Sequence, residues 1–317
     1  MSSSATTTAG RIAARPAVGR LSRKWLQIGL YVGPAAALYV LFVIVPVVQA
    51  VRYSLYSWNG LGPLTDFVGL DNYSEAFRDS AFRQAMEHNG ILIALSLGLQ
   101  FPLTLAVALL LNRPLRGRSL LRLIFFTPYV LSEAITAIVF LQILQPNGLV
   151  DQFLRSIGLG SLVQLWLADI GLVFYTLFVV ITWKYIGFGI ILFLAGLQGI
   201  PRELHEAAAI DGATSWTTLR YVTMPLLGPT IRLWAFLATI GSIQLFDLVW
   251  IMTLGGPAGA SSTMATYMID QGFRSYRVGF ATSVAVILFF ICFVVSILYQ
   301  ILVLRRDVPG RTTRMAG

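Results

Sequence analysis

Three ionisable side chains, Glu133, Lys184 and Asp247, lie inside long apolar runs of this 317-residue sequence. A charge inside a membrane is costly, so such groups are candidates for function. The polar side chains beside Lys184 and Asp247 are Tyr185, Ser242 and Gln244. Aromatic faces with a few polar anchors suit a small polar ligand such as a sugar ring. We therefore predict a substrate-binding set of Lys184, Tyr185, Ser242, Gln244 and Asp247.

These ionisable residues also have a second interpretation. A structural ion pair between Lys184 and Asp247 would offset part of the cost of burying both charges between two spans. Glu133 lies near the start of its apolar run, and there a contact at the membrane interface or with a partner is the predicted role.

Other kinds of chemistry lack the residues they need. One cysteine, Cys292, and two histidines, His88 and His205, are too few for a metal site. The two lysines, Lys24 and Lys184, do not follow glycine, so there is no P-loop of the Gly-Lys-Ser/Thr type. We predict no catalytic residues and no cofactor bound by this chain, and any ATP hydrolysis then comes from another chain.

The composition points to a membrane protein. Hydrophobic residues make up 56% and charged residues 12% of the chain, against about 25% charged residues in soluble domains. The mean hydropathy of +0.75 argues against a soluble enzyme or a disordered binding protein. A helix needs roughly 20 apolar residues to cross a bilayer. Six stretches are long enough, at approximately 27–51, 91–111, 120–144, 171–199, 230–254 and 278–304. The predicted fold class is an all-α membrane protein with six transmembrane helices.

Basic residues set the predicted orientation. They gather in residues 1–26, in the 112–119 loop and in residues 305–317, which lie on one side of a six-span arrangement. Because cytoplasmic loops carry an excess of Lys and Arg, we place this side and both termini in the cytoplasm. We predict a disordered basic tail at 1–26 that suits anionic lipid, a membrane domain at 27–304, and a second basic tail at 305–317.

The 200–229 loop begins with a predicted helix outside the membrane. Pro201 fits the first turn of a helix, and Glu203 and Glu206 lie near the positive end of the helix dipole. Three alanines, at positions 207–209, follow as strong helix formers, and Gly212 can end the helix in a left-handed conformation.

A second short helix is predicted after this turn. Thr214 or Ser215 can cap it, and we expect it to stop before Met224 because Pro225 disfavours helical geometry in the residue before it. A DNA-binding helix-turn-helix is a poor alternative. The loop has too few basic residues to neutralise phosphates, so we predict no nucleic-acid partner.

This loop resembles the coupling loop of binding-protein-dependent ABC importers. The resemblance rests on the spacing of Glu206-Ala207-Ala208, Gly212, Val222, Met224 and Pro225. Val222 and Met224 replace the more usual Ile and Leu and keep the apolar character. The coupling residues that the resemblance implies are Glu203, Glu206, Ala207, Ala208, Asp211, Gly212 and Pro225.

Other segments resemble the carbohydrate branch of the same family. They are FVGLDNY at 67–73 and the segments 125–151, 252–270 and 279–291, so that the resemblance covers most of residues 27–304. The chain looks like the first inner-membrane permease subunit of maltose- or glycerol-phosphate-type systems, without the large external insertion and extra leading spans of the maltose subunit. This implies a type I ABC importer permease fold with a cytoplasmic coupling helix.

The resemblance also implies a mechanism and partners. A second homologous permease subunit would complete the pathway, and a P-loop ATPase dimer, which binds ATP and Mg, would receive the coupling helix. An extracellular or periplasmic sugar-binding protein would deliver the substrate. The chain would be a non-catalytic, multi-pass protein of the bacterial inner membrane.

Three alternatives remain at this stage. One is an importer for another polar solute, such as glycerol phosphate or a polyol. A phosphorylated substrate would call for several arginines in the pathway, and no span interior shows them. A secondary transporter would not explain the 200–229 loop. A membrane-embedded enzyme would need a catalytic cluster in the spans, where paired carboxylates and His are missing.

Overall fold

The computed structural model describes residues 18–114 and 116–301, and the predicted tail residues before 18 and after 301 lie outside the described residues. The chain divides between Ala50 and Val51 into two compact units. The first holds a continuous run of helix: α1 (Val18–Tyr39), the π-helical turn η1 (Val40–Ile44) and α2 (Val45–Tyr53) as far as Ala50. Since α1 begins at Val18, residues 18–26 of the predicted disordered tail are helical.

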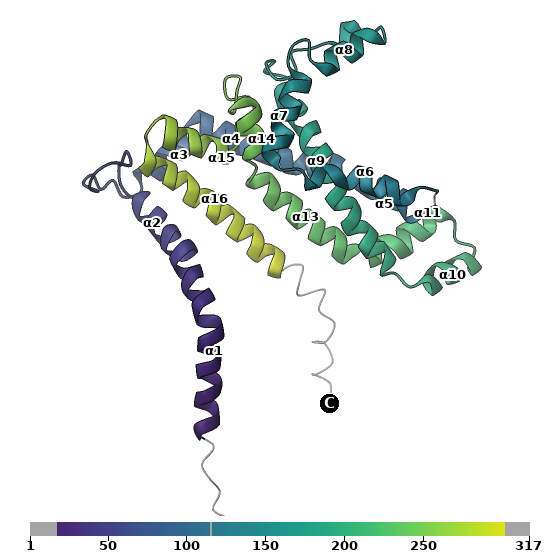
Figure 1. The fold of residues 1–317 in the computed structure, drawn as a ribbon, viewed down its shortest axis with the longest axis horizontal. Helices are drawn as coiled ribbons and strands as arrows, with labels where there is room; N and C mark the ends of the chain where they lie inside the picture. Colours follow the sequence, from purple (N-terminus) through teal and green to yellow (C-terminus); the bar gives the residue numbers. More distant parts are fainter. Residues whose placement is uncertain (1–17, 115, 302–317) are drawn as a thin grey trace, which may run out of the picture. The chain divides into compact units, whose positions relative to one another are not determined.

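The described part of the second unit consists of helices joined by loops (Figure 1). Its first half contains α3 (Asp71–Arg78), α4 (Ser80–Leu95), η2 (Ser96–Gln100), α5 (Phe101–Asn112), α6 (Arg118–Val130), α7 (Glu133–Leu144), α8 (Leu149–Ser156) and η3 (Gly160–Leu162). Its second half contains α9 (Val173–Gln198), α10 (Arg202–Ile210), α11 (Ser215–Thr218), η4 (Leu219–Thr223), α12 (Met224–Leu226), α13 (Gly228–Ile243), α14 (Asp247–Thr253), α15 (Met264–Ile269), η5 (Asp270–Arg274) and α16 (Val278–Tyr299). Among the described residues, β pairing is limited to one isolated bridge, between Tyr56 and Phe67.

Five helices of the described chain are long and apolar enough to cross a membrane. They are Gln27–Tyr53, Ser80–Asn112, Val173–Gln198, Gly228–Thr253 and Val278–Tyr299. The predicted span at 120–144 is instead a pair, α6 and α7, bent by 99°. The bend follows from local chemistry: Leu131 is extended, and the Ser132 hydroxyl accepts the backbone N–H of Ile135 to start a new helix. The predicted six spans are reached when this pair counts as one.

In the described part of the chain, three π-helical turns end two residues before a proline. Pro46 follows η1, Pro102 follows η2 and Pro225 follows η4. Proline lacks an N–H and its ring clashes with the carbonyl four residues earlier in an α-helix. A π turn bonds each N–H five residues back, as Met224 N–H does to the Leu219 carbonyl, and this relieves the clash.

One boundary prediction is therefore wrong. We expected the second helix of the 200–229 loop to stop before Met224, but α11, η4 and α12 run on through Pro225 to Leu226. The residue before a proline usually leaves the helical region. Here Met224 keeps helical angles because the widened turn of η4 accommodates the proline ring.

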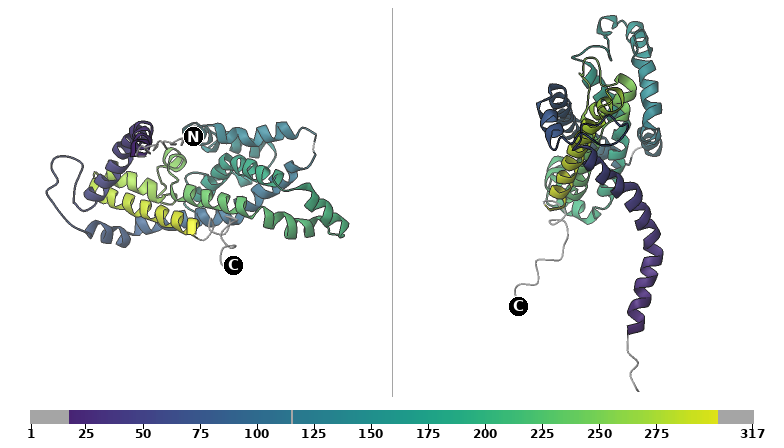
Figure 2. Two further views of the ribbon diagram at one scale, coloured as in Figure 1. Left: turned by 90° about the horizontal axis from the view of Figure 1, so that it is seen from below. Right: turned by 90° about the vertical axis from the view of Figure 1, so that its left-hand side faces the viewer.

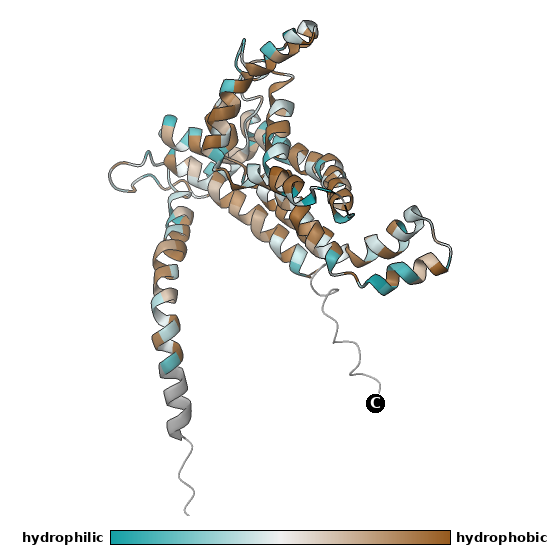
Figure 3. Ribbon diagram, turned by 45° about the vertical axis from the view of Figure 1, so that its right-hand side comes forward, coloured by the Kyte–Doolittle hydropathy of each residue, from teal (hydrophilic) through white to brown (hydrophobic). Residues whose placement is uncertain are grey.

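The central helix of the second unit is α9, which packs against α5, α6 and α13. Its glycines allow close approach: a Cβ at Gly187 would overlap the Phe125 carbonyl of α6, and one at Gly189 would lie 2.5 Å from the Trp234 Nε1 of α13. Aromatic side chains on the outward side, such as Phe290 of α16, are exposed as expected for a lipid-facing surface. Figure 3 shows that hydrophobic residues dominate these long helices, whereas polar residues are frequent in α10.

The α6–α9 contact gives a stability prediction. Gly187→Ala should lower the unfolding free energy by about 1–3 kcal/mol, because the added methyl group must push α6 away. Gly90→Ala is the matched control, since a Cβ there meets no atom within 4 Å. The measurement is the thermal unfolding midpoint of the purified protein in detergent. Equal midpoints for the two variants would contradict the close approach of α6 to α9.

Candidate functional site

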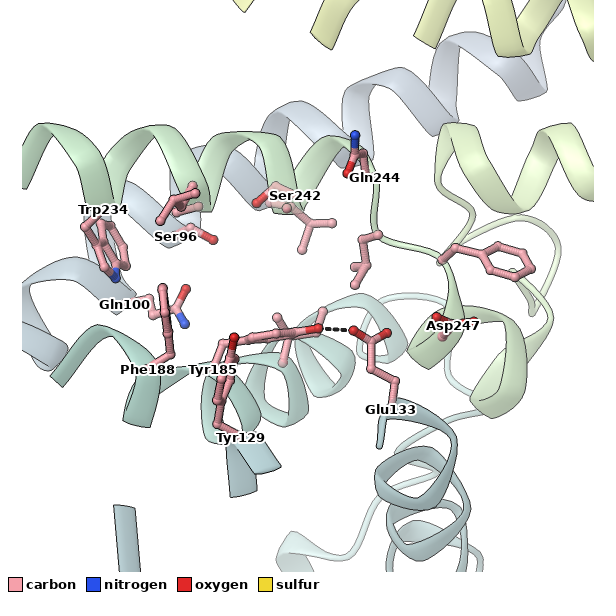
Figure 4. Close-up of a pocket in the computed structure, with 17 residues that line it drawn as sticks. Ser96, Gln100, Tyr129, Glu133, Tyr185, Phe188, Trp234, Ser242, Gln244 and Asp247 are labelled. Atoms are coloured by element: carbon pink, nitrogen blue, oxygen red, sulfur yellow. Dashed lines mark hydrogen bonds between the residues drawn. The ribbon is translucent and has the colours of Figure 1, made fainter. Parts of the chain in front are cut away.

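A cavity of about 400 Å³ lies inside the second unit, between α9 and two interrupted helices. One interruption separates α6 from α7, and the other separates α13 from α14 at residues 244–246. The residues of α4 and η2 close the remaining side. Figure 4 shows the polar side chains that surround this space. The described residues that line it include Ser96, Gln100, Tyr129, Glu133, Tyr185, Phe188, Trp234, Ser242, Gln244 and Asp247.

Two polar walls face each other across the cavity. On one wall, Tyr185 of α9 donates its hydroxyl hydrogen bond to the carboxylate of Glu133, the first residue of α7 (Figure 4). On the other wall, Ser242 and Gln244 lie at the end of α13, and Asp247 begins α14. The Asp247 carboxylate makes no hydrogen bond to any described residue, so it is available to accept one from a ligand.

Aromatic rings form the rest of the lining. Tyr129 stacks on Phe188 with ring centroids 5.1 Å apart, and it meets Tyr185 edge-on at 6.2 Å. Trp234 lies at the same end of the cavity as Phe188 (Figure 4). Flat apolar faces beside carboxylate and amide oxygens can bind a ring that carries hydroxyl groups. No lysine or arginine is among the described lining residues, so the site offers hydrogen-bond acceptors and no fixed positive charge.

Lys184 does not join the other predicted substrate residues. Its side chain is only 2% exposed, and its ammonium group donates a 2.6 Å hydrogen bond to the Leu131 carbonyl. It lies behind the lining rather than within it. Nor does it pair with Asp247: no ion pair joins the two in the described part of the chain. The other four predicted substrate residues, Tyr185, Ser242, Gln244 and Asp247, do line the cavity.

Some lining residues were not predicted. Glu133, assigned to an interface or a partner contact, lies on the cavity wall, and Gln100, Tyr129 and Trp234 were not singled out. Gln100 carried a usable signal, since it is a polar residue inside the apolar run 91–111. For the two aromatic residues, sequence alone does not separate a cavity wall from ordinary packing.

The predicted turn in the 200–229 loop is confirmed in detail. α10 ends at Ile210, and Gly212 follows with a φ of 75°. The Gly212 N–H bonds the Ala209 carbonyl, and the Ala213 N–H bonds the Ala208 carbonyl, which is the hydrogen-bond pattern of a Schellman cap. Thr214 then caps α11 by accepting the Thr217 N–H.

This α10–α11 hairpin presents an uncovered surface. Glu203, Glu206 and Ala207 are exposed, and Ile210 is 86% exposed. The remaining predicted coupling residues on the hairpin are Ala208, half-buried, and Asp211 and Gly212, both exposed. Pro225 lies at the base of the hairpin, in α12. Figures 1 and 2 show the hairpin at the same end of the second unit as the α5–α6 connection, which carries the basic residues of the 112–119 loop.

Comparison with known proteins identifies the family. The family model described as the inner membrane component of binding-protein-dependent transport systems matches residues 75–308, and the chain belongs to this family. The lactose transport system permease protein LacF of Rhizobium radiobacter is 34% identical over 248 residues, which are 77% of this chain and 83% of that protein. The multiple sugar-binding transport system permease protein MsmF of Streptococcus mutans is 35% identical over 268 residues, 82% of this chain and 89% of that protein.

The fold is also that of a solved importer. A crystal structure of a bacterial ABC transporter involved in the import of the acidic polysaccharide alginate matches with a TM-score of 0.79 and 22% identity, over 92% of this chain and 99% of that chain. The predicted fold class and family are therefore confirmed. The chain is a multi-pass transmembrane subunit of a binding-protein-dependent importer.

The Schellman cap gives a second prediction. Gly212→Val should loosen the hairpin, because a β-branched residue at positive φ costs about 1–3 kcal/mol. Limited proteolysis of the purified protein should then cut within 200–229 several times faster than in the unmodified chain. Gly212→Asn is the control, since asparagine tolerates the left-handed conformation. If both variants resist cleavage equally, the left-handed turn does not hold the hairpin.

Proposed function

We propose that the chain forms half of the translocation pathway of an ATP-driven sugar importer. The observation that carries the proposal is the cavity: aromatic rings lie beside two carboxylates and two amides, and no basic side chain is among the described lining residues. Sugar hydroxyls can donate to these oxygens while the ring faces pack on the aromatic residues. The names of LacF and MsmF refer to lactose and to multiple sugars, which supports the same class of substrate.

The alternative importer of a phosphorylated solute fits the cavity less well. A phosphate group is normally held by arginine, lysine or a cluster of backbone N–H groups. Here Glu133 and Asp247 would repel a dianion in a region of low dielectric constant. A neutral polyol remains compatible with the lining.

Within the cavity, we assign substrate contact to Tyr185, Ser242, Gln244 and Asp247, and we add Glu133. These five belong to two opposite walls of the space, so that together they can contact two sides of one ring (Figure 4). The Gln244 amide nitrogen donates to the Cys292 sulfur of α16 in this structure, so Gln244 would contact a ligand only after a change of rotamer. Lys184 would not contact the substrate. Its hydrogen bond to the Leu131 carbonyl would instead influence the position of Glu133 on the cavity wall.

The α10–α11 hairpin is the proposed coupling site for a separate P-loop ATPase dimer, which would bind ATP and Mg. Glu203, Glu206 and Asp211 would bond basic residues of that partner. Ala207 and Ala208 would allow close approach, Gly212 would form the turn, and Pro225 would lie at the base of the hairpin. The hairpin exposes several large apolar side chains, Leu204, Ile210 and Trp216, and a group of this kind supports a protein partner here.

The remaining parts of the assembly follow the family. A second permease subunit would complete the pathway, and an extracellular or periplasmic sugar-binding protein would deliver substrate on the side opposite the hairpin. We place the hairpin, the 112–119 loop and both termini in the cytoplasm of a bacterium, with the spans in its inner membrane. The shared position of the hairpin and the basic α5–α6 connection supports this orientation.

The coupling assignment gives a third prediction. Glu206→Lys should reduce sugar uptake to background at unchanged membrane levels, because it reverses a charge that faces the ATPase. Uptake by cells and the amount of ATPase that copurifies with the permease are the measurements. Asp71→Lys, the same reversal at an exposed position of α3, is the control. Normal uptake by the Glu206→Lys variant would refute the assignment.

The substrate assignment gives a fourth prediction. Asp247→Asn should raise the half-saturation constant for sugar uptake about tenfold or more, because a charge-assisted hydrogen bond is replaced by a weaker neutral one. The probes are radiolabelled lactose, maltose, glucose and glycerol phosphate, supplied to cells that contain the complete importer. Uptake of glycerol phosphate in preference to every sugar would overturn the sugar class. A half-saturation constant unchanged in Asp247→Asn would remove Asp247 from the site.

A further inference from the structure

The two helix breaks that form the cavity leave backbone carbonyls without helical partners. The last four carbonyls of any helix lack an intrahelical N–H. Inside a membrane, such groups cannot rely on bulk water, and each one left unsatisfied is costly. Both α6 and α13 end at the cavity wall, so the carbonyls of their last turns need other hydrogen-bond donors there.

At the first break, the solution is Lys184 of α9. Its ammonium group donates to the Leu131 carbonyl, immediately after α6 and two residues before Glu133. A cation at the C-terminal end of a helix is also favoured by the helix dipole. Lys184 therefore satisfies the end of one helix at the point where the next must start with Glu133 on the cavity wall.

At the second break, the solution is Asn89 of α4. It is 2% exposed, and its amide nitrogen donates to the Ser242 carbonyl at 2.6 Å and to the Ile243 carbonyl at 3.3 Å. Its amide oxygen accepts the Met264 N–H at 2.9 Å. One side chain thus joins the end of α13 to the start of α15.

We propose that Asn89 and Lys184 are positioning residues for the cavity. Each comes from a neighbouring unbroken stretch of helix, each is 2% exposed, and each binds the carbonyl end of a different break. Between them they fix where Glu133 and Asp247 stand on opposite walls. Their influence on sugar affinity rests on the proposed function, whereas their control of the two breaks does not.

Hydrogen–deuterium exchange on the importer complex, with no sugar added, tests the control of the breaks. Lys184→Met removes the donor and should speed amide exchange about tenfold within residues 127–136, leaving 238–247 unchanged. Asn89→Leu should speed exchange within 238–247 and leave 127–136 unchanged. The matched control is Asn72→Leu, since Asn72 is also buried and donates to two carbonyls, those of Ser54 and Tyr56, but lies away from the cavity. It should affect neither break.

A second variant separates the two roles of Asn89. Asn89→Asp keeps an oxygen for the Met264 N–H but loses both donors to α13. Exchange should rise at 238–247 and stay unchanged at 263–269. A rise confined to 263–269 would show that Asn89 anchors α15 and not the break. Exchange that is unchanged at both breaks, or raised evenly over the chain in either single variant, would overturn the proposal.

Uptake of radiolabelled lactose and maltose adds the functional result. At matched membrane levels, Lys184→Met and Asn89→Leu should raise the half-saturation constant at least fivefold, with a smaller effect on the maximal rate, and Asn72→Leu should leave the constant unchanged. An unchanged constant in both variants would remove their role in affinity. If the unmodified importer transports no sugar while exchange changes locally as expected, the sugar assignment fails and the positioning role stands.

Discussion

The cavity depends on one constraint: a helix that ends inside a membrane must find partners for its free carbonyls. The ends of α6 and α13 meet it with buried side chains from neighbouring helices, Lys184 and Asn89. A third buried side chain, Thr263, donates from its hydroxyl to the Leu245 carbonyl. Because buried side chains of neighbouring helices already bond the carbonyls at the breaks, the side chains that follow the breaks are free to face the cavity. This explains how polar residues such as Gln244 and Asp247 can occupy an otherwise apolar bundle.

The same constraint explains how the helical runs keep Pro102 and Pro225, whereas Pro128 lies inside α6 without a π turn before it. An interior proline removes one backbone donor and presses on a carbonyl. The chain widens the helix by one π turn before Pro102 and Pro225, and the helical run continues without an exposed gap. The bundle therefore contains two kinds of irregularity. The π turns preserve a helix, whereas the breaks end one, and it is the breaks that open the second unit to a ligand.

The sequence was most informative where a local rule acts alone. Gly212 ends α10 because only a residue that tolerates positive φ fits there, and Thr214 caps α11 as its hydroxyl predicts. Hydropathy located the spans but not the 99° bend at Leu131. An apolar run has the same hydropathy whether its helix is straight or broken. Lys184 was recognised as significant, yet its partner was a backbone carbonyl, which no pairing of side-chain charges can reveal. The position of Glu133 on the cavity wall was not predicted for a related reason, since it follows from the bend at Leu131.

The cavity and the hairpin are linked by the two helices on either side of the hairpin. α9 carries Tyr185 near its middle and ends four residues before α10 begins, and α13 begins just after α12 and ends at the cavity with Ser242 and Ile243. The two helices are locked together where Trp234 of α13 lies against Gly189 and Thr230 lies against Gly196. Helices whose interface is tightly packed, with no voids between them, transmit a displacement from one to the other. Under the proposed coupling, a displacement of the hairpin would reach both polar walls, because Tyr185 lies on α9 and Ser242 on α13. It would also reach the α6–α7 break, because Lys184 of α9 bonds the Leu131 carbonyl there.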